Sequence, residues 1–99
     1  MELDISWDPV KAQANLIKHA VSFTQAATAM LDPLALSTFD AAHSDTEERW
    51  FTLGLSRDGL LLAIAYTYHV SGPASAKVRL ISARTATRRE RDQYQNLPQ

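Results

Sequence analysis

The sequence predicts a small single α+β domain over residues 1–99, in which an antiparallel β-sheet has its helices packed on one side. Two observations lead to this fold class. A chain of 99 residues with 45% hydrophobic and 21% charged side chains is large enough for one modest core. Helix-capping signals and runs of alternating polar and apolar residues follow one another in the order β-α-α-β-β-β-β-α.

The helices are predicted from their N-terminal capping residues. An Asp, Ser or Thr side chain can accept hydrogen bonds from the free amides of a first turn, and proline suits the first helical position because it has no N–H. We expect the first helix to run to about residue 19, the second to end at Asp32-Pro33, and the third to be anchored by Tyr94. The three starts are Asp8-Pro9, Ser22 to Gln25, and Thr87 to Glu90.

The first predicted helix is amphipathic. Its apolar stripe follows the spacing i, i+4, i+7 and consists of Val10, Ala14 and Ile17. The opposite stripe consists of Lys11, Asn15, Lys18 and His19.

The strands are predicted from period-2 alternation and from apolar runs bounded by turn residues. They cover residues 3–7, 34–39, 49–55, 60–69 and 77–84. The longest apolar run, 60–69, predicts a central strand covered on both faces, preceded by a hairpin turn at Asp58-Gly59. Segments 40–48 and 70–76 are expected to be loops.

Charge is unevenly divided along the chain. Residues 1–48 contain two lysines and eight carboxylates, a net −6, whereas residues 49–99 contain eight basic groups and three carboxylates, a net +5. This split predicts a surface for a polyanion, with mutual attraction of the two halves as the alternative. Without cysteine, a signal-peptide pattern or an apolar run long enough to cross a bilayer, the chain is expected to be a soluble cytoplasmic protein.

Most of the positive charge lies in the last predicted strand and helix. Alternation places Lys77 and Arg79 on one face of the strand and Arg84 on the other face, with Val78. Three more arginines crowd the first turn of the helix, where the helix dipole disfavours cations. These are Arg88, Arg89 and Arg91. They indicate an anionic partner, or else neutralisation by acidic residues of the chain itself.

The segment HSDTEER, residues 43–49, combines groups suited to acid–base chemistry beside a cation. They are His43, Glu47, Glu48 and Arg49, at a junction between loop and strand. A solvated acidic loop is the alternative interpretation. The three histidines lack metal-ligand spacing, and there is no Gly-rich phosphate loop, so we expect neither a metal site nor a cofactor.

Three segments form a recognisable set: WDPVKAQANLIKHAVSF from Trp7, HSDTEER from His43, and ISARTATRRER from Ile81. This set resembles the BrnT family of toxins from type II toxin–antitoxin systems, over about Trp7 to Tyr94. The resemblance implies a RelE-like fold and a ribonuclease that arrests growth. It also implies neutralisation by a BrnA-like antitoxin with a ribbon-helix-helix domain, in a complex of two toxins and two antitoxins that contacts operator DNA only through the antitoxin. Ala20 stands where the family usually has glycine.

The residues and the resemblance together predict a metal-independent endoribonuclease. Cleavage by the 2′-OH needs a positioned acid or base and cations to neutralise the phosphorane, and the planar fork of arginine matches phosphate. The predicted catalytic residues are Arg79, Arg84, Arg49, Glu48 and His43; the predicted RNA-binding residues are Lys18, His19, Tyr68, Lys77 and Arg88. The alternative function is a non-catalytic basic module that docks an acidic protein or nucleic acid.

Overall fold

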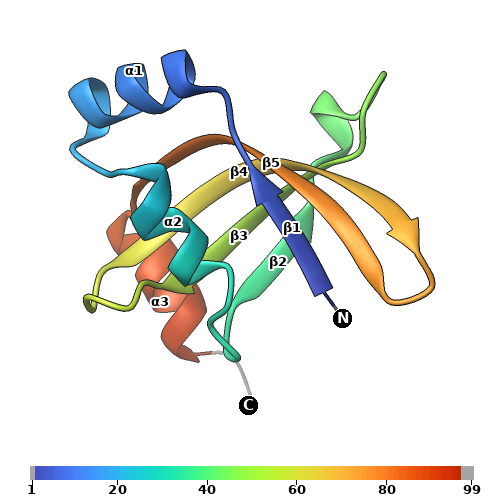
Figure 1. Ribbon diagram of the computed structural model, residues 1–99. Helices are drawn as coiled ribbons and strands as arrows, with labels where there is room; N and C mark the ends of the chain where they lie inside the picture. Colours follow the sequence, from blue (N-terminus) through green and yellow to red (C-terminus); the bar gives the residue numbers. More distant parts are fainter. Residues whose placement is uncertain (1, 97–99) are drawn as a thin grey trace.

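The computed structural model describes residues 2–96, which form a five-stranded sheet, three α-helices and one short 3-10 helix (Figure 1). The strands are β1 (Glu2–Ser6), β2 (Leu36–Phe39), β3 (Arg49–Leu55), β4 (Leu61–Gly72) and β5 (Ser75–Thr85). The helices are α1 (Pro9–His19), α2 (Phe23–Ala29) and α3 (Arg88–Asn96), and the 3-10 helix η1 spans Ala41–His43. The predicted order of strands and helices is confirmed.

The sheet is mixed, so the prediction of an antiparallel sheet is wrong at one strand. Its order is β1-β5-β4-β3-β2, with β1 parallel to β5 and every other pair antiparallel. Alternation in β1 shows which face of the strand is buried, but it is the same for either direction of pairing. The direction is set by the partner strand, where Ile5 lies beside Val78.

Helices α1 and α2 cover one face of the sheet, and α3 lies on the other (Figure 1). The core under α1 and α2 includes Phe23, Ile64 and Leu80. On the opposite face, Leu53 and Ala63 pair across β3 and β4 and are each 2% exposed. The prediction that the helices pack on one side of the sheet is therefore correct for α1 and α2 and wrong for α3.

Polar contacts fix α3 at its position. The Tyr94 hydroxyl donates to Asp32 Oδ2 at 2.5 Å, and the same oxygen accepts from the Leu55 N–H at 2.8 Å. Burial opposes ionisation of Asp32, but the hydrogen bonds from Tyr94, Leu55 and Leu34 keep its pKa below the ordinary value. Burial and the Asp32 carboxylate raise the pKa of Tyr94 to about 12. Tyr94 is thus the anchor of α3, as predicted.

All three predicted helix caps are present. The Val10 N–H donates to Asp8 Oδ1 at 3.0 Å at the start of α1. Ser22 and Gln25 exchange the two hydrogen bonds of a capping box at the start of α2, and Thr87 and Glu90 do so before α3.

Helix α2 packs very closely on the sheet at Gly54. A Cβ atom at this position would lie 2.4 Å from the carbonyl oxygen of Ala29. Glycine is therefore required here, because any side chain would push α2 away from β3.

The segment 70–76, predicted to be a loop, forms the end of a long β4–β5 hairpin (Figure 1). The ladder continues through the pairs His69–Lys77 and Val70–Ala76. Only residues 73 and 74 lie between the two strands. The prediction was wrong because Gly, Pro and Ser are typical of turns, whereas here the two strands support each other's extended backbone.

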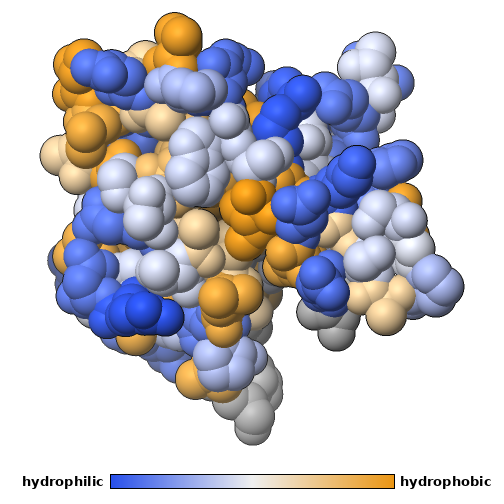
Figure 2. Space-filling model, viewed as in Figure 1, coloured by the Kyte–Doolittle hydropathy of each residue, from blue (hydrophilic) through white to orange (hydrophobic). Residues whose placement is uncertain are grey.

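Helix α1 turns its apolar stripe outward. Val10 and Ile17 are 76% and 79% exposed, and apolar side chains gather over α1 at the upper left of Figure 2. From the opposite, polar stripe, Asn15 is only 6% exposed. The helix therefore packs on the sheet through small and polar side chains rather than through its apolar stripe.

Strand β5 contains a β-bulge at Ile81. Leu80 pairs with Tyr66 and Ser82 pairs with the adjacent Ala65, so Ile81 has no partner of its own on β4. One extra residue in a strand shifts the alternation of all the side chains that follow it.

The bulge brings Arg84 onto the same face as Arg79. Leu80 and Ala83, on either side of the bulge, both lie in the core under α1 and α2, which turns Arg79 and Arg84 to the opposite face. Strict alternation predicted opposite faces for these two arginines, and that prediction is wrong.

Asn15 completes the edge of β5 beyond the bulge, where β1 no longer pairs with it. Its Oδ1 accepts from the Ala83 N–H at 3.0 Å, and its Nδ2 donates to the carbonyl oxygens of Ala83 and Val21 at 2.8 and 2.9 Å. The side-chain amide thereby takes the place of a neighbouring strand and satisfies buried backbone groups.

Helix α1 ends at Ala20, which has the left-handed backbone angles φ 57° and ψ 27° and donates its N–H to the Leu16 carbonyl. This conformation is costly for a residue with a Cβ.

Asn15→Ala should destabilise the protein by about 3 kcal/mol, because three buried backbone groups lose their partner. Urea unfolding followed by circular dichroism measures the change. Gln13→Ala, an exposed position on the same helix, is the control and should stay within about 0.5 kcal/mol of the wild type. Equal losses in the two variants would contradict the role given to Asn15.

Candidate functional site

Four polar residues form a row across the sheet face opposite to α1 and α2. Arg49 of β3 pairs with Thr67 of β4, which pairs with Arg79 of β5. Asp40 extends the row, because its N–H donates to the Arg49 carbonyl at 2.9 Å and it lines a cavity on this face together with Phe51. We call Asp40, Arg49, Thr67 and Arg79 the arginine row.

The two arginines of the row can reach a common ligand above Thr67. Neighbouring strands lie about 4.8 Å apart, which puts the backbones of Arg49 and Arg79 about 10 Å from each other. Thr67, between them, is only 7% exposed and lines a cavity together with Glu47. Two guanidinium groups on either side of one position form a binding place for an anion such as phosphate.

Arg79 is paired with Glu47. Its Nη2 donates to Glu47 Oε1 at 2.7 Å, and the two side chains are 49% and 48% exposed. An ion pair with this exposure contributes little stability, so a phosphate can take the place of the carboxylate at small cost.

His43 joins the site through Asp40. Nδ1 of His43 lies 2.9 Å from Asp40 Oδ2, and η1 places the two residues on one turn. The carboxylate favours a proton on Nδ1, which leaves Nε2 as the nitrogen that can accept or donate a proton. The imidazole side chain is 64% exposed and thus accessible to a substrate.

Arg84, predicted to be catalytic, is bound to α3. Its Nη1 and Nη2 donate to the Glu90 carboxylate at 2.7 and 3.0 Å, and its guanidinium carbon lies 5.8 Å from the centre of the Phe51 ring. The hydrogen bonds with Glu90 raise the pKa of Arg84 above its ordinary value, and those from Arg84 lower the pKa of Glu90 to about 2. We call this pair the Arg84–Glu90 clasp.

Two predicted site residues lie on the face covered by α1 and α2. The Glu48 carboxylate accepts from Trp50 Nε1 at 2.7 Å, and Trp50 packs against the core of that face. The ring of Tyr68 also packs against this core, 6.4 Å from the indole of Trp50. Glu48 and Tyr68 also line a cavity of about 450 Å³ with Thr67 and Glu47, so they lie at the border of the arginine row rather than within it.

The remaining predicted RNA-binding residues are distributed over three places. Lys77 lies on the face of the arginine row. It pairs with His69, two residues along each strand from the pair formed by Thr67 and Arg79. Lys18 and His19 form the last turn of α1, in the helical layer on the opposite face. Arg88 is the exposed first residue of α3.

The basic start of α3 faces solvent. Arg88, Arg89 and Arg91 are exposed, and none of the ion pairs within residues 2–96 includes them. Glu90 binds Arg84 and the N-terminus of the helix instead. These three arginines are available to a separate anionic partner.

Asp40 and Thr67 had no predicted role, and Glu47 was an acid–base candidate that was not included among the predicted catalytic residues. Asp40 stands three positions before His43, a helical spacing that could have indicated a contact. Glu47 stands in the HSDTEER segment beside Glu48, and only the strand geometry distinguishes these two carboxylates. Thr67 has no sequence signal, because its place between two arginines depends on the register of three strands.

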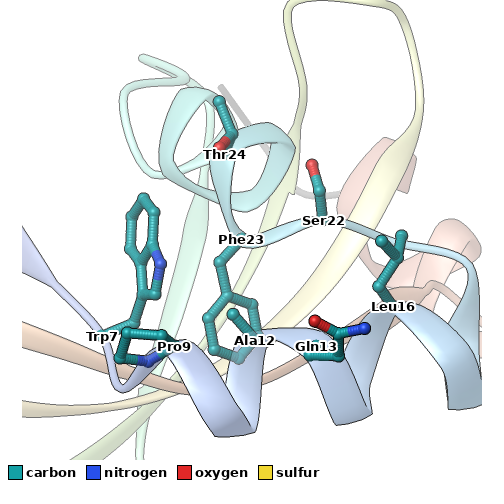
Figure 3. A pocket seen from close by; sticks show the side chains of 8 residues that line it. All are labelled: Trp7, Pro9, Ala12, Gln13, Leu16, Ser22, Phe23 and Thr24. Carbon is teal, nitrogen blue, oxygen red and sulfur yellow. The ribbon is translucent and has the colours of Figure 1, made fainter.

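The groove between α1 and α2 (Figure 3) is not part of this site. It has a volume of about 280 Å³, and its lining, which includes Trp7, Leu16 and Phe23, contains no charged side chain. It also lies on the side of the sheet away from the arginine row. In the described part of the chain, no cluster of three or more His, Asp or Glu suited to a metal ion occurs, and no helix there could span a membrane.

Comparison with known families identifies the family of this chain. The family described as "Ribonuclease toxin, BrnT, of type II toxin-antitoxin system" matches residues 7–90. The chain belongs to the BrnT family. This BrnT-family chain is thus a ribonuclease toxin of a type II system, a class that implies an antitoxin partner. No curated protein matches the chain.

The fold agrees with a solved member of the family. The crystal structure of the Brucella abortus ribonuclease toxin, BrnT, determined at 1.1 Å resolution, superposes with a TM-score of 0.56 at 20% sequence identity. The alignment covers 89% of this chain and 100% of the Brucella chain. At this identity the likeness concerns the fold.

Glu90→Gln should reduce the sensitivity of the protein to acid. The pKa of Glu90 in the fold is about 2 against an ordinary 4.5, so its ionised form stabilises the fold above pH 4.5, and this contribution is lost as the pH falls toward 2. We expect the variant to be about 2 kcal/mol less stable at pH 7. Its free energy of unfolding should also fall less steeply through this acid range, in urea titrations at a series of pH values.

Asp92→Asn, an exposed position on the same helix, is the control and should keep the wild-type dependence on pH. An unchanged acid slope in Glu90→Gln would show that the Arg84–Glu90 clasp is absent in solution.

Proposed function

We propose that this toxin is a metal-independent endoribonuclease in which the arginine row binds the scissile phosphate. The observation that supports this most directly is the pairing of Arg49 and Arg79 with Thr67 between them. It places two cations on one accessible face, at a separation that suits a single phosphate.

In this mechanism the 2′-oxygen of one nucleotide forms a bond to the adjacent phosphorus, and the bond from phosphorus to the 5′-oxygen of the next nucleotide breaks. The intermediate phosphorane has an added negative charge. Arg49 and Arg79 neutralise it from either side, without the reorganisation that water would require. Glu47 gives up its exposed ion pair with Arg79 when the phosphate binds.

Proton transfer is assigned to His43, with Asp40 as the positioning residue on Nδ1. The 2′-OH loses a proton and the leaving 5′-oxygen gains one, so a second proton-transfer group acts beside His43. Glu47 is a better candidate for this role than Glu48, because it lies beside Arg79 whereas Glu48 is bound to Trp50 on the other face. Arg84 is assigned to holding α3, since both of its terminal nitrogens already bind Glu90. Lys77 and Arg88 extend the positive surface along the RNA.

The proposal includes the partner and the cellular site. A BrnA-like antitoxin with a ribbon-helix-helix DNA-binding domain neutralises the toxin in the cytoplasm, in a complex of two toxins and two antitoxins. Operator DNA is contacted through the antitoxin alone. The description of the family as the toxin of a type II system supports the presence of an antitoxin partner.

The nuclease proposal is tested with purified toxin and single-stranded RNA in EDTA. Cleavage should proceed and leave 2′,3′-cyclic phosphate ends, and Arg49→Ala and Arg79→Ala should each lower kcat/KM by about 100-fold or more. Arg57→Ala, an exposed arginine in the turn between β3 and β4, is the matched control and should behave as the wild type.

Cleavage that requires added magnesium would contradict the metal-independent mechanism. RNA that is bound but stays intact under both conditions would favour a non-catalytic basic binding module.

The partner proposal is tested by co-expression of the toxin with the antitoxin from the neighbouring reading frame. Light scattering after gel filtration should give the mass of two 11.0 kDa toxins plus two antitoxins, and the complex should not cleave RNA. A stable complex with one copy of each chain would contradict the proposed stoichiometry.

A further inference from the structure

A cavity of about 470 Å³ opens on the face of the arginine row, between β2 and α3. Phe51 and Leu53 of β3 form its floor. Thr38 and Asp40 line one side, and Arg84 and Gln93 line the other. Its size falls within the range of small-molecule sites, about 300–1,000 Å³.

This cavity begins next to the proposed phosphate site. Phe51 follows Arg49 by two residues on β3, so both side chains point to the same face, about 7 Å apart. Asp40 belongs both to the arginine row and to the cavity wall. A group attached to a phosphate in the arginine row can therefore enter the cavity.

The floor and one wall of the cavity present two flat groups. The Phe51 ring is half-buried, and the Arg84 guanidinium lies 5.8 Å from its centre. Unpaired RNA bases stack on aromatic rings and on guanidinium planes. Because the Arg84–Glu90 clasp fixes the guanidinium, this stacking surface exists before any ligand binds.

The polar groups at the rim select among bases. The oxygens of the Asp40 carboxylate can accept further hydrogen bonds besides the contact of Oδ2 with His43, and the Gln93 amide offers one more acceptor beside its donors. Guanine presents two adjacent donors, N1–H and N2–H, on its Watson–Crick edge, whereas uracil presents a single N3–H. A carboxylate at this position therefore favours guanine over uracil.

We propose that this cavity is a nucleobase subsite that receives the base of the nucleotide whose 2′-OH attacks, and that it prefers guanine. The proposal rests on the ribonuclease function proposed above and adds a base preference to it. Phe51 provides stacking, and Asp40 and Gln93 recognise the edge of the base.

Binding is tested without catalysis, by titrating ¹⁵N-labelled toxin with 3′-GMP and with 3′-UMP and recording the amide shifts. 3′-GMP should bind about tenfold more tightly, with the largest shifts at Thr38, Phe51 and Gln93. Equal affinities for the two nucleotides, or shifts confined to other parts of the chain, would overturn the proposal.

Selectivity in cleavage is tested with DNA oligonucleotides that contain one ribonucleotide, either rG or rU, so that cleavage is possible at one position only. The ratio of kcat/KM for rG over rU should be about ten or more in the wild type. Phe51→Leu and Gln93→Ala should bring this ratio close to one. Gln95→Ala, an exposed glutamine on the same helix outside the cavity, is the matched control and should keep the wild-type ratio.

The two proposals fail in different ways. Cleavage of rG and rU at equal rates by the wild type would overturn the base subsite and leave the ribonuclease proposal intact. Selective binding of 3′-GMP in the cavity, with no cleavage of any oligonucleotide, would support the subsite and overturn the ribonuclease proposal.

Discussion

The β-bulge at Ile81 is the constraint on which the functional face depends. Arg79 and Arg84 are five residues apart, so a regular strand would point them to opposite faces of the sheet. The extra residue lets Arg79 enter the arginine row while Arg84 reaches α3 on the same face. Asn15 holds the backbone just beyond the bulge, so a side chain buried under α1 maintains the geometry of the opposite surface.

The two arginine–glutamate pairs of this face have different physical roles. Arg79 and Glu47 are both about half-exposed, and solvent competes for each partner. In the Arg84–Glu90 clasp, Glu90 is only 16% exposed and receives two parallel hydrogen bonds, so its rupture would leave a carboxylate without a partner in a poorly hydrated place. The first pair is suited to exchange with a phosphate, and the second forms a permanent wall of the neighbouring cavity.

The sequence predicted the features that depend on neighbours within a few residues. The caps at Asp8, Ser22 and Thr87 were placed correctly, because each cap consists of hydrogen bonds across two or three positions. Where a residue's surroundings come from distant segments, prediction was less successful. Tyr68 packs beside Trp50 on the face covered by α1 and α2, and Phe51, with no predicted role, lies on the face of the arginines.

The sequence by itself determined the family, the order of the elements, the helix caps and the basic character of the C-terminal half. Only the tertiary structure decided the direction of β1, the side on which α3 packs and the faces of Arg84 and Glu48. Hydrophobic alternation indicates which residues of a strand share a face. The pairing direction, the register and the bulges are set by the neighbouring strand. The arginine row is formed by three paired strands and by Asp40, which follows β2, so no single segment of the chain contains it.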